Sequence, residues 1–259
     1  MDELKIKVKT KYASIATQVL SEGDAICSQS RDHADISEDA STSTGYVVEA
    51  DLALGCGMPV KFAMISQGDV VMDLGCGAGS DCFIASTETG PQGKVIGLDF
   101  VDAMIVRAER NRKALNINNI SFIIGDIESI PLKDESVDVV ISNCALNLVP
   151  NKQKAYAEIY RILRREGHFS VSDLVMDGPF PAVFQQIAEE YTGCVSGAIQ
   201  LTEYLNIIKS AGFNDIEVQK KRAIELPKEL LVNHLNDDDF SHVSNFYGIY
   251  SINLFARKC

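Results

Sequence analysis

The chain has 259 residues, enough for one large α/β domain with a full hydrophobic core. Hydrophobic residues make up 46% and charged residues 23%, an ordinary balance for a globular protein, and the formal net charge is −12. This charge disfavours nucleic acids and anionic membrane surfaces as partners, since both are bound through clustered Lys and Arg. No apolar run approaches the roughly 20 residues of a membrane span, and the opening MDELKIKVKTKY lacks the apolar stretch of a signal peptide. We therefore expect a cytoplasmic protein with no nucleic-acid or membrane partner; the sequence does not indicate an oligomeric state.

The first 66 residues differ from the rest of the chain. Residues 2–20 carry apolar groups at helical spacing, 21–47 are rich in Ser, Asp and Thr, and 48–66 return to helical spacing around Gly-Cys-Gly at 55–57. We expect 1–66 to form a helix, a long loop and a cap segment. They would join a domain at 67–259 in one structural unit, because no linker composition separates them.

Strand and helix patterns alternate after residue 66. The segments that fit strands are 69–75, 94–100, 120–126, 137–144, 168–176, 215–225 and 248–258. Helices are expected after the glycine-rich turn, at 101–116 with Asp102 as its cap, and at 151–165 with Asn151 as its cap. Two helical pieces within 175–211 would cover the substrate. This alternation predicts an α/β fold with a doubly wound, mostly parallel sheet.

Four features fall at the carboxyl ends of the predicted strands. They are the glycine turn after the first strand, Asp99 after the second, Asp126 after the third, and Asn143-Cys144 after the fourth. Because ligands of such sheets bind beyond the carboxyl ends of the strands, we expect one binding site there.

The glycine turn has the pattern GxGxG, at Gly75, Gly77 and Gly79, which lets the backbone approach a ligand closely. A dinucleotide site would have GxGxxG, but the third position of that pattern holds Ser80. Asp99 lies at the end of the next strand, where its carboxylate can accept both ribose hydroxyls of a nucleoside.

The series DLGCGAG, GLDF, GDIESIP and VDVVISN resembles the motifs of the class I methyltransferases. The resemblance implies a Rossmann-like fold of seven strands with S-adenosylmethionine as cofactor. It implies Gly75 and Gly77 at the methionine end, Asp99 at the ribose, and Asp126 and Ile127 at the adenine. The other expected cofactor residues are Asp73, Phe100, Met104 and Asn143, the last through its backbone near the methionine portion.

Seven cysteines occur without any CxxC pair, which disfavours a zinc ribbon or a thioredoxin-type site. A single Cys is usually a small buried apolar residue, and we interpret Cys76 and Cys82 in this way. Cys56 and Cys194 instead lie beside glycines, in LGCGMP and YTGCVSGA, and Cys144 ends the fourth strand at the predicted cofactor edge.

LGCGMP, DLGCGAGSDCFIA, VISNCALNLVP and YTGCVSGA together resemble the arsenite methyltransferases, as do GYVVEADLALGCG and the ending SINLFARK. The resemblance implies that the thiols of Cys56, Cys144 and Cys194 hold trivalent arsenic and carry the catalysis. Cys27 lies near a further N-terminal Cys of many members, but its surroundings, AICSQS, depart from the family, so its role stays open.

The resemblance thus predicts methyl transfer from S-adenosylmethionine to thiol-bound trivalent arsenic, with an external thiol as reductant and methylated arsenicals as products. Two alternatives stay open. One is a methyltransferase of the same fold acting on carbon or oxygen of a small metabolite, as in quinone biosynthesis. The other is a thiol-based soft-metal binder or sensor on a methyltransferase scaffold.

Overall fold

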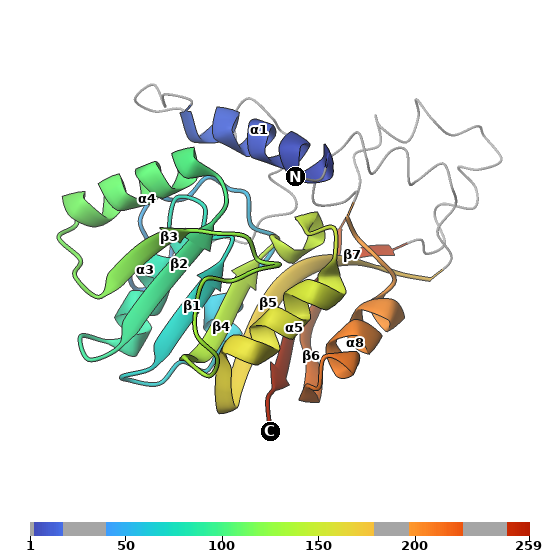
Figure 1. The fold of residues 1–259 in the computed structure, drawn as a ribbon. Coiled ribbons are helices and arrows are strands. Elements are labelled where there is room, and N and C mark those ends of the chain that lie inside the picture. The colour runs from blue at the N-terminus through green and yellow to red at the C-terminus, as the bar shows by residue number, and fades with distance from the viewer. Residues whose placement is uncertain (1–2, 18–39, 179–196, 225–247) are drawn as a thin grey trace.

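The computed structural model describes residues 3–17, 40–178, 197–224 and 248–259. Within these ranges, seven strands form one sheet in the order β3-β2-β1-β4-β5-β7-β6 (Figure 1). The strands are β1 Val70–Leu74, β2 Lys94–Asp99, β3 Ile120–Ile124, β4 Val137–Asn143, β5 Leu163–Asp177, β6 Asn214–Ile224 and β7 Gly248–Arg257.

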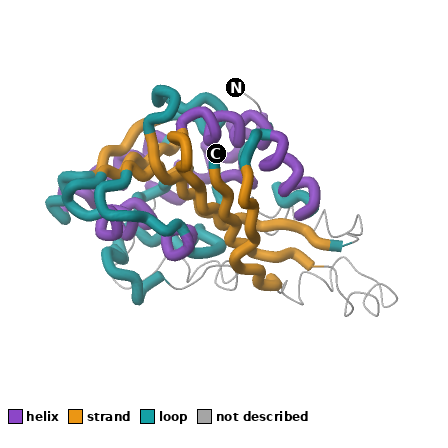
Figure 2. Tube along the Cα trace, turned by 90° about the horizontal axis from the view of Figure 1, so that it is seen from below, coloured by secondary structure: helices purple, strands orange, loops and turns teal. Residues whose placement is uncertain are grey.

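Helices cover both faces of this sheet, and Figure 2 shows strands running between them. The helices are α1 Glu3–Thr17, α2 Pro59–Phe62, α3 Ser80–Thr89, α4 Asp102–Ala114, α5 Lys152–Ile162 and α8 Leu201–Ser210, with a short 3-10 helix at Leu146–Leu148. One core cluster packs α5 and α8 on the sheet through side chains such as Tyr156 and Tyr204. A second cluster packs α2, α3 and α4 on the opposite face through side chains such as Phe83 and Ile105. The predicted α/β fold is confirmed.

The sheet reverses its winding between β1 and β4. The chain runs from β1 outward through β2 to β3, then returns to place β4 on the other side of β1, all in parallel. β5 continues in parallel beside β4, whereas β7 is antiparallel to both β5 and β6. In open sheets of this kind the reversal leaves a crevice at the carboxyl ends of the two central strands.

Three local predictions were wrong. Residues 48–66 form turns and the four-residue helix α2 rather than a longer helix. The helix that begins after Asn151 ends at Ile162 rather than Arg165, because Leu163 already pairs with Val137 of β4. Asp102 is the first residue of α4 rather than its cap, which is Val101. Asn151 does cap α5, since its side chain accepts a hydrogen bond from Lys154 N at 2.9 Å.

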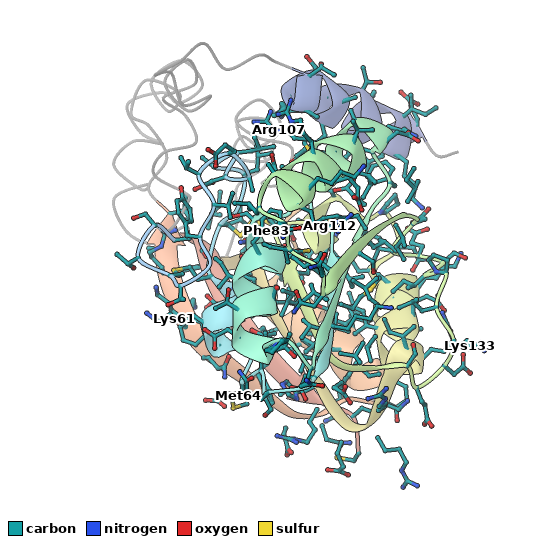
Figure 3. All side chains as sticks on the ribbon, turned by 90° about the vertical axis from the view of Figure 1, so that its left-hand side faces the viewer. Lys61, Met64, Phe83, Arg107, Arg112 and Lys133 are labelled. Carbon is teal, nitrogen blue, oxygen red and sulfur yellow. A yellow bond between two sulfur atoms is a disulfide. The ribbon has the colours of Figure 1, made fainter. Side chains whose placement is uncertain are left out.

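Helix α1 lies beside α4, at the end of the molecule where Figure 3 shows Arg107. Arg107 Nη1 donates to Ala16 O at 3.4 Å, and Lys9 forms an ion pair of 2.6 Å with Asp102. None of the helices in the described ranges has the length and apolarity required to cross a membrane.

Candidate active site

A cavity of about 420 Å³ opens at the carboxyl ends of β1, β2 and β4, where the sheet reverses. Every residue that the sequence suggested for the cofactor lines this cavity. These residues are Asp73, Gly75, Gly77, Asp99, Phe100, Met104, Asp126, Ile127 and Asn143. The sequence therefore located the cavity, because parallel strands bring their carboxyl ends to one edge.

The glycine turn forms one wall of the cavity. Gly77 has a φ of +51°, and a Cβ at this position would meet no atom within 4 Å. The open space beside Gly77 thus lets a ligand approach the backbone more closely than a side chain would allow. Gly77 N donates to Asp99 Oδ2 at 3.0 Å, which ties the turn to the end of β2.

Asp99 is fixed from two sides and is only 8% exposed. Its Oδ1 accepts from Val101 N at 2.9 Å, in addition to the bond from Gly77. Burial raises the pKa of this carboxyl, although the donated backbone hydrogen bonds oppose the rise. A carboxylate offers about four acceptor positions, so Asp99 retains capacity for hydroxyl donors of a ligand.

The cavity wall is acidic. Burial raises the pKa of Asp73 well above its usual range, and the charge of Asp81 adds to the rise. Burial likewise raises the pKa of Asp81 to about 6, against a hydrogen bond from Asn143 and with repulsion from Asp51. Neighbouring carboxyl groups disfavour each other's ionised form, whereas a nearby positive charge favours it. This wall therefore favours a cationic ligand.

Helix α1 supplies part of the cavity wall, which the sequence did not indicate. Val8 and Tyr12 line the cavity, and Lys5 Nζ donates to Asp126 Oδ2 at 2.6 Å and to Glu128 Oε2 at 2.8 Å. Burial would raise the pKa of Asp126, but the Lys5 bond and charge outweigh it and lower that pKa. No motif in 3–17 marks this contact, because it joins residues 121 positions apart.

Cys56 and Cys144 meet beside this cavity. The two residues form a disulfide with Cα atoms 5.9 Å apart, and Cys144 also lines the cavity. Cys144 has a φ of +59°, the left-handed region that a non-glycine residue seldom adopts, directly after the last residue of β4. Cys27 and Cys194 lie outside the described residues. Among those that are described, no three His, Cys, Asp or Glu side chains form a metal-binding group.

Apolar side chains pack against the Cys56–Cys144 disulfide. Cys56 and Cys144 are 0% and 4% exposed, and they share a cluster with Leu174, Ala198 and Ile249. Ala198 follows Cys194 by only four positions (198 − 194). Ala198 thus places the start of the described segment 197–224 beside Cys56 and Cys144.

Cys76 and Cys82 are buried free thiols, in agreement with their predicted packing role. Cys82 has a further contact, because its Sγ donates to Asp73 Oδ2 at 3.1 Å. Burial raises the pKa of Cys76 to about 11 and that of Cys82 well above its usual range, so both thiols are protonated at neutral pH.

Comparisons with known proteins match this chain to methyltransferases. A sequence family described as "Methyltransferase domain" matches residues 65–212. An arsenite methyltransferase of Halobacterium salinarum is 40% identical over 233 residues, which cover 85% of this chain and 60% of that protein. The human arsenite methyltransferase is 31% identical over 168 residues, covering 61% of this chain and 44% of that protein. This chain thus spans less than two thirds of these relatives.

Among solved structures, an arsenic (III) S-adenosylmethionine methyltransferase from Chlamydomonas reinhardtii superposes with a TM-score of 0.66. It is 26% identical, and the match covers 91% of this chain and 74% of that one.

Proposed function

Since this chain belongs to the methyltransferase domain family, we propose that it transfers a methyl group from S-adenosylmethionine to trivalent arsenic held by cysteine thiolates, giving methylated arsenicals. One observation carries this proposal: Cys56 and Cys144, which yield two thiols when their disulfide is reduced, lie together, and Cys144 lines the cavity that all nine expected cofactor residues line. A methyltransferase acting on carbon or oxygen has no use for this pair.

The cavity fits S-adenosylmethionine. The acidic wall of Asp73 and Asp81 suits a ligand that carries a sulfonium and an ammonium, and Asp99 has acceptor capacity for ribose hydroxyls. Asp126 and Ile127, for which we propose contact with the adenine, line the cavity just after the end of β3. When bound, this cofactor supplies an electrophilic methyl group on a sulfonium, which a lone pair can attack.

The thiols suit trivalent arsenic as a substrate. Soft ions favour thiolate ligands, and an arsenic held by three of them retains a lone pair. No proton then needs to leave the nucleophile, so no general base is required. The role of the protein is to fix the direction of attack.

The third thiol of the proposal is Cys194. Four residues of chain span at most about 14 Å, and Ala198 packs with Cys56 and Cys144. This short separation along the chain supports the choice of Cys194 as the third ligand. We propose that 175–211 covers the substrate, as part of one unit in which 1–66 caps the domain at 67–259. The contacts Lys5–Asp126 and Cys56–Cys144 support this arrangement.

Methylation formally oxidises the arsenic, and two thiols can return the electrons by forming a disulfide. Cys56 and Cys144 are close enough for that reaction. An external thiol would then reduce the disulfide by exchange and restore the site. Since this cycle requires reduced cysteines, the cytoplasm is the compartment we propose.

Arsenite binding tests the acceptor directly. Reduced protein is incubated with arsenite, passed through gel filtration and analysed for arsenic per chain by mass spectrometry. We expect arsenic to be retained by the wild type and by Cys259→Ser, an exposed thiol, but lost in Cys56→Ser and Cys144→Ser. Equal retention in all variants contradicts thiolate binding. Retention without methyl transfer would identify a soft-metal binder.

A further inference from the structure

The backbone of Cys56 is held on both sides by side chains from distant strands. Its N–H donates to Asn143 Oδ1 at 3.0 Å, and its carbonyl accepts from Ser251 Oγ at 2.6 Å. The next residue is held as well, since Gly57 N donates to Asn143 Oδ1 at 3.3 Å and Gly57 O accepts from Asn143 Nδ2 at 2.9 Å. The segment 55–57 is thus bonded to the end of β4 and to β7.

Asn143 makes one further bond, from Nδ2 to Asp81 Oδ2 at 3.0 Å. Its amide therefore makes four hydrogen bonds, two accepted and two donated, which is its full capacity. The amide also packs tightly, because a Cβ at Gly55 would lie 2.6 Å from Asn143 Nδ2. Asn143 directly precedes Cys144, so one side chain joins the backbone of the first thiol residue, the strand of the second and a carboxylate of the cofactor cavity.

We infer that Asn143 is a positioning residue, which sets the separation of the Cys56 and Cys144 thiols and their place relative to the cofactor cavity. The effect of Asn143 on catalysis rests on the proposed function. Its effect on the separation of the two thiols does not. The sequence predicts a contact of the Asn143 backbone with the cofactor, whereas this inference concerns its side chain. No other residue type of this size both accepts from two backbone N–H groups and donates two hydrogen bonds.

The test measures how strongly the two thiols pair. Full-length wild type and Asn143→Ala are equilibrated in glutathione redox buffers, quenched by alkylation and digested, and the Cys56–Cys144 disulfide is quantified by mass spectrometry. The effective concentration of one thiol at the other should fall about tenfold or more in Asn143→Ala, because several hydrogen bonds that hold segment 55–57 are lost.

Asn119→Ala is the matched control. Asn119 also holds a loop through its amide, donating to Ser86 O at 3.3 Å and Gly90 O at 3.0 Å, but it is not part of the thiol cluster. Its removal lowers stability without changing thiol pairing. Asn143→Asp is a second variant in case the alanine variant does not fold. It lacks both donors and places a carboxylate against Asp81, so it should also weaken pairing. A wild-type effective concentration in either folded Asn143 variant overturns the inference.

Kinetics separate this inference from the proposed function. If the wild type methylates arsenite, Asn143→Ala should raise KM for arsenite by a larger factor than it raises Kd for S-adenosylmethionine. An equal increase in the two overturns the positioning role. If the wild type does not methylate arsenite at all, the proposed function fails, whereas the redox measurement still decides the role of Asn143.

Discussion

Asn143 Nδ2 donates to Asp81 Oδ2 at 3.0 Å, which connects the segment that carries Cys56 to the acidic wall of the cofactor cavity. The hydrogen bond favours the ionised form of Asp81, but burial outweighs it and the pKa is about 6. The charge of Asp81 therefore changes within a pH range in which the protein can be studied.

Cofactor affinity should depend on pH through Asp81. Above pH 6 the ionised carboxylate attracts a cationic ligand, and protonation removes that charge as pH falls. We expect Kd for S-adenosylmethionine, measured by calorimetry, to rise about tenfold between pH 8 and pH 5. Asp81→Asn should bind more weakly at pH 8 and show a flatter profile. A wild-type profile in that variant would contradict the role of Asp81.

Replacement of Asp99 should weaken cofactor binding. Hydrogen bonds to a charged group contribute about 1.5–3 kcal/mol, so Asp99→Ala should raise Kd for S-adenosylmethionine about 10- to 100-fold. Asp134→Ala is a suitable control, because this aspartate pairs with Arg161 and is not among the cavity-lining residues. Unchanged binding in Asp99→Ala would refute the ribose assignment.

Replacing the cysteine ligands should lower the methylation rate without weakening cofactor binding. Cys144→Ser and Cys194→Ser should each lower the rate of arsenic methylation by at least about 100-fold, because the acceptor is no longer fixed in the line of attack. Kd for S-adenosylmethionine should stay nearly unchanged, and Cys259→Ser should behave as the wild type. Full activity in either of the first two variants would contradict thiolate ligation.

Stability should vary with pH through Asp173. Burial raises its pKa to about 7, against the bond from Tyr204 Oη, which lies 2.6 Å from Asp173 Oδ2. In the unfolded chain this carboxyl ionises near its usual pKa of about 3.9, so the folded state binds the extra proton between these values. Its contribution to the free energy of unfolding is therefore present at low pH and is lost as pH rises toward 7.

Asp173→Asn removes this titration. Relative to the wild type, the variant should gain on the order of 3 kcal/mol in free energy of unfolding between pH 4 and pH 8. Urea titrations at several pH values measure this difference. A constant difference between the two proteins would show that Asp173 does not hold a proton in the folded state.

The sequence predicted the strands and the cavity better than the contacts across the cavity. Residues such as Asp99 and Asp126 follow buried strands, and their convergence is a consequence of parallel pairing. The hydrogen bond between Cys56 and Asn143 joins residues 87 positions apart, and that between Lys5 and Asp126 joins residues 121 positions apart. No local sequence pattern reveals contacts at such separations.

In two segments, tertiary hydrogen bonds override a local tendency to form a helix. The segment 48–66 has helical spacing, yet part of its backbone forms hydrogen bonds with strand side chains instead, as Cys56 O does with Ser251 Oγ at 2.6 Å. Gly55 and Gly57 further weaken a helix there. Similarly, α5 ends early because pairing with β4 satisfies the backbone from Leu163 onward.

A single-turnover experiment tests the central claim most directly. Reduced protein is loaded with arsenite, mixed with S-adenosylmethionine labelled in its methyl group and an external thiol, and the arsenic species are separated and counted. We predict labelled methylarsenic in the wild type and none above the no-enzyme control in Cys144→Ser. Bound cofactor with no label on arsenic in the wild type would contradict the account.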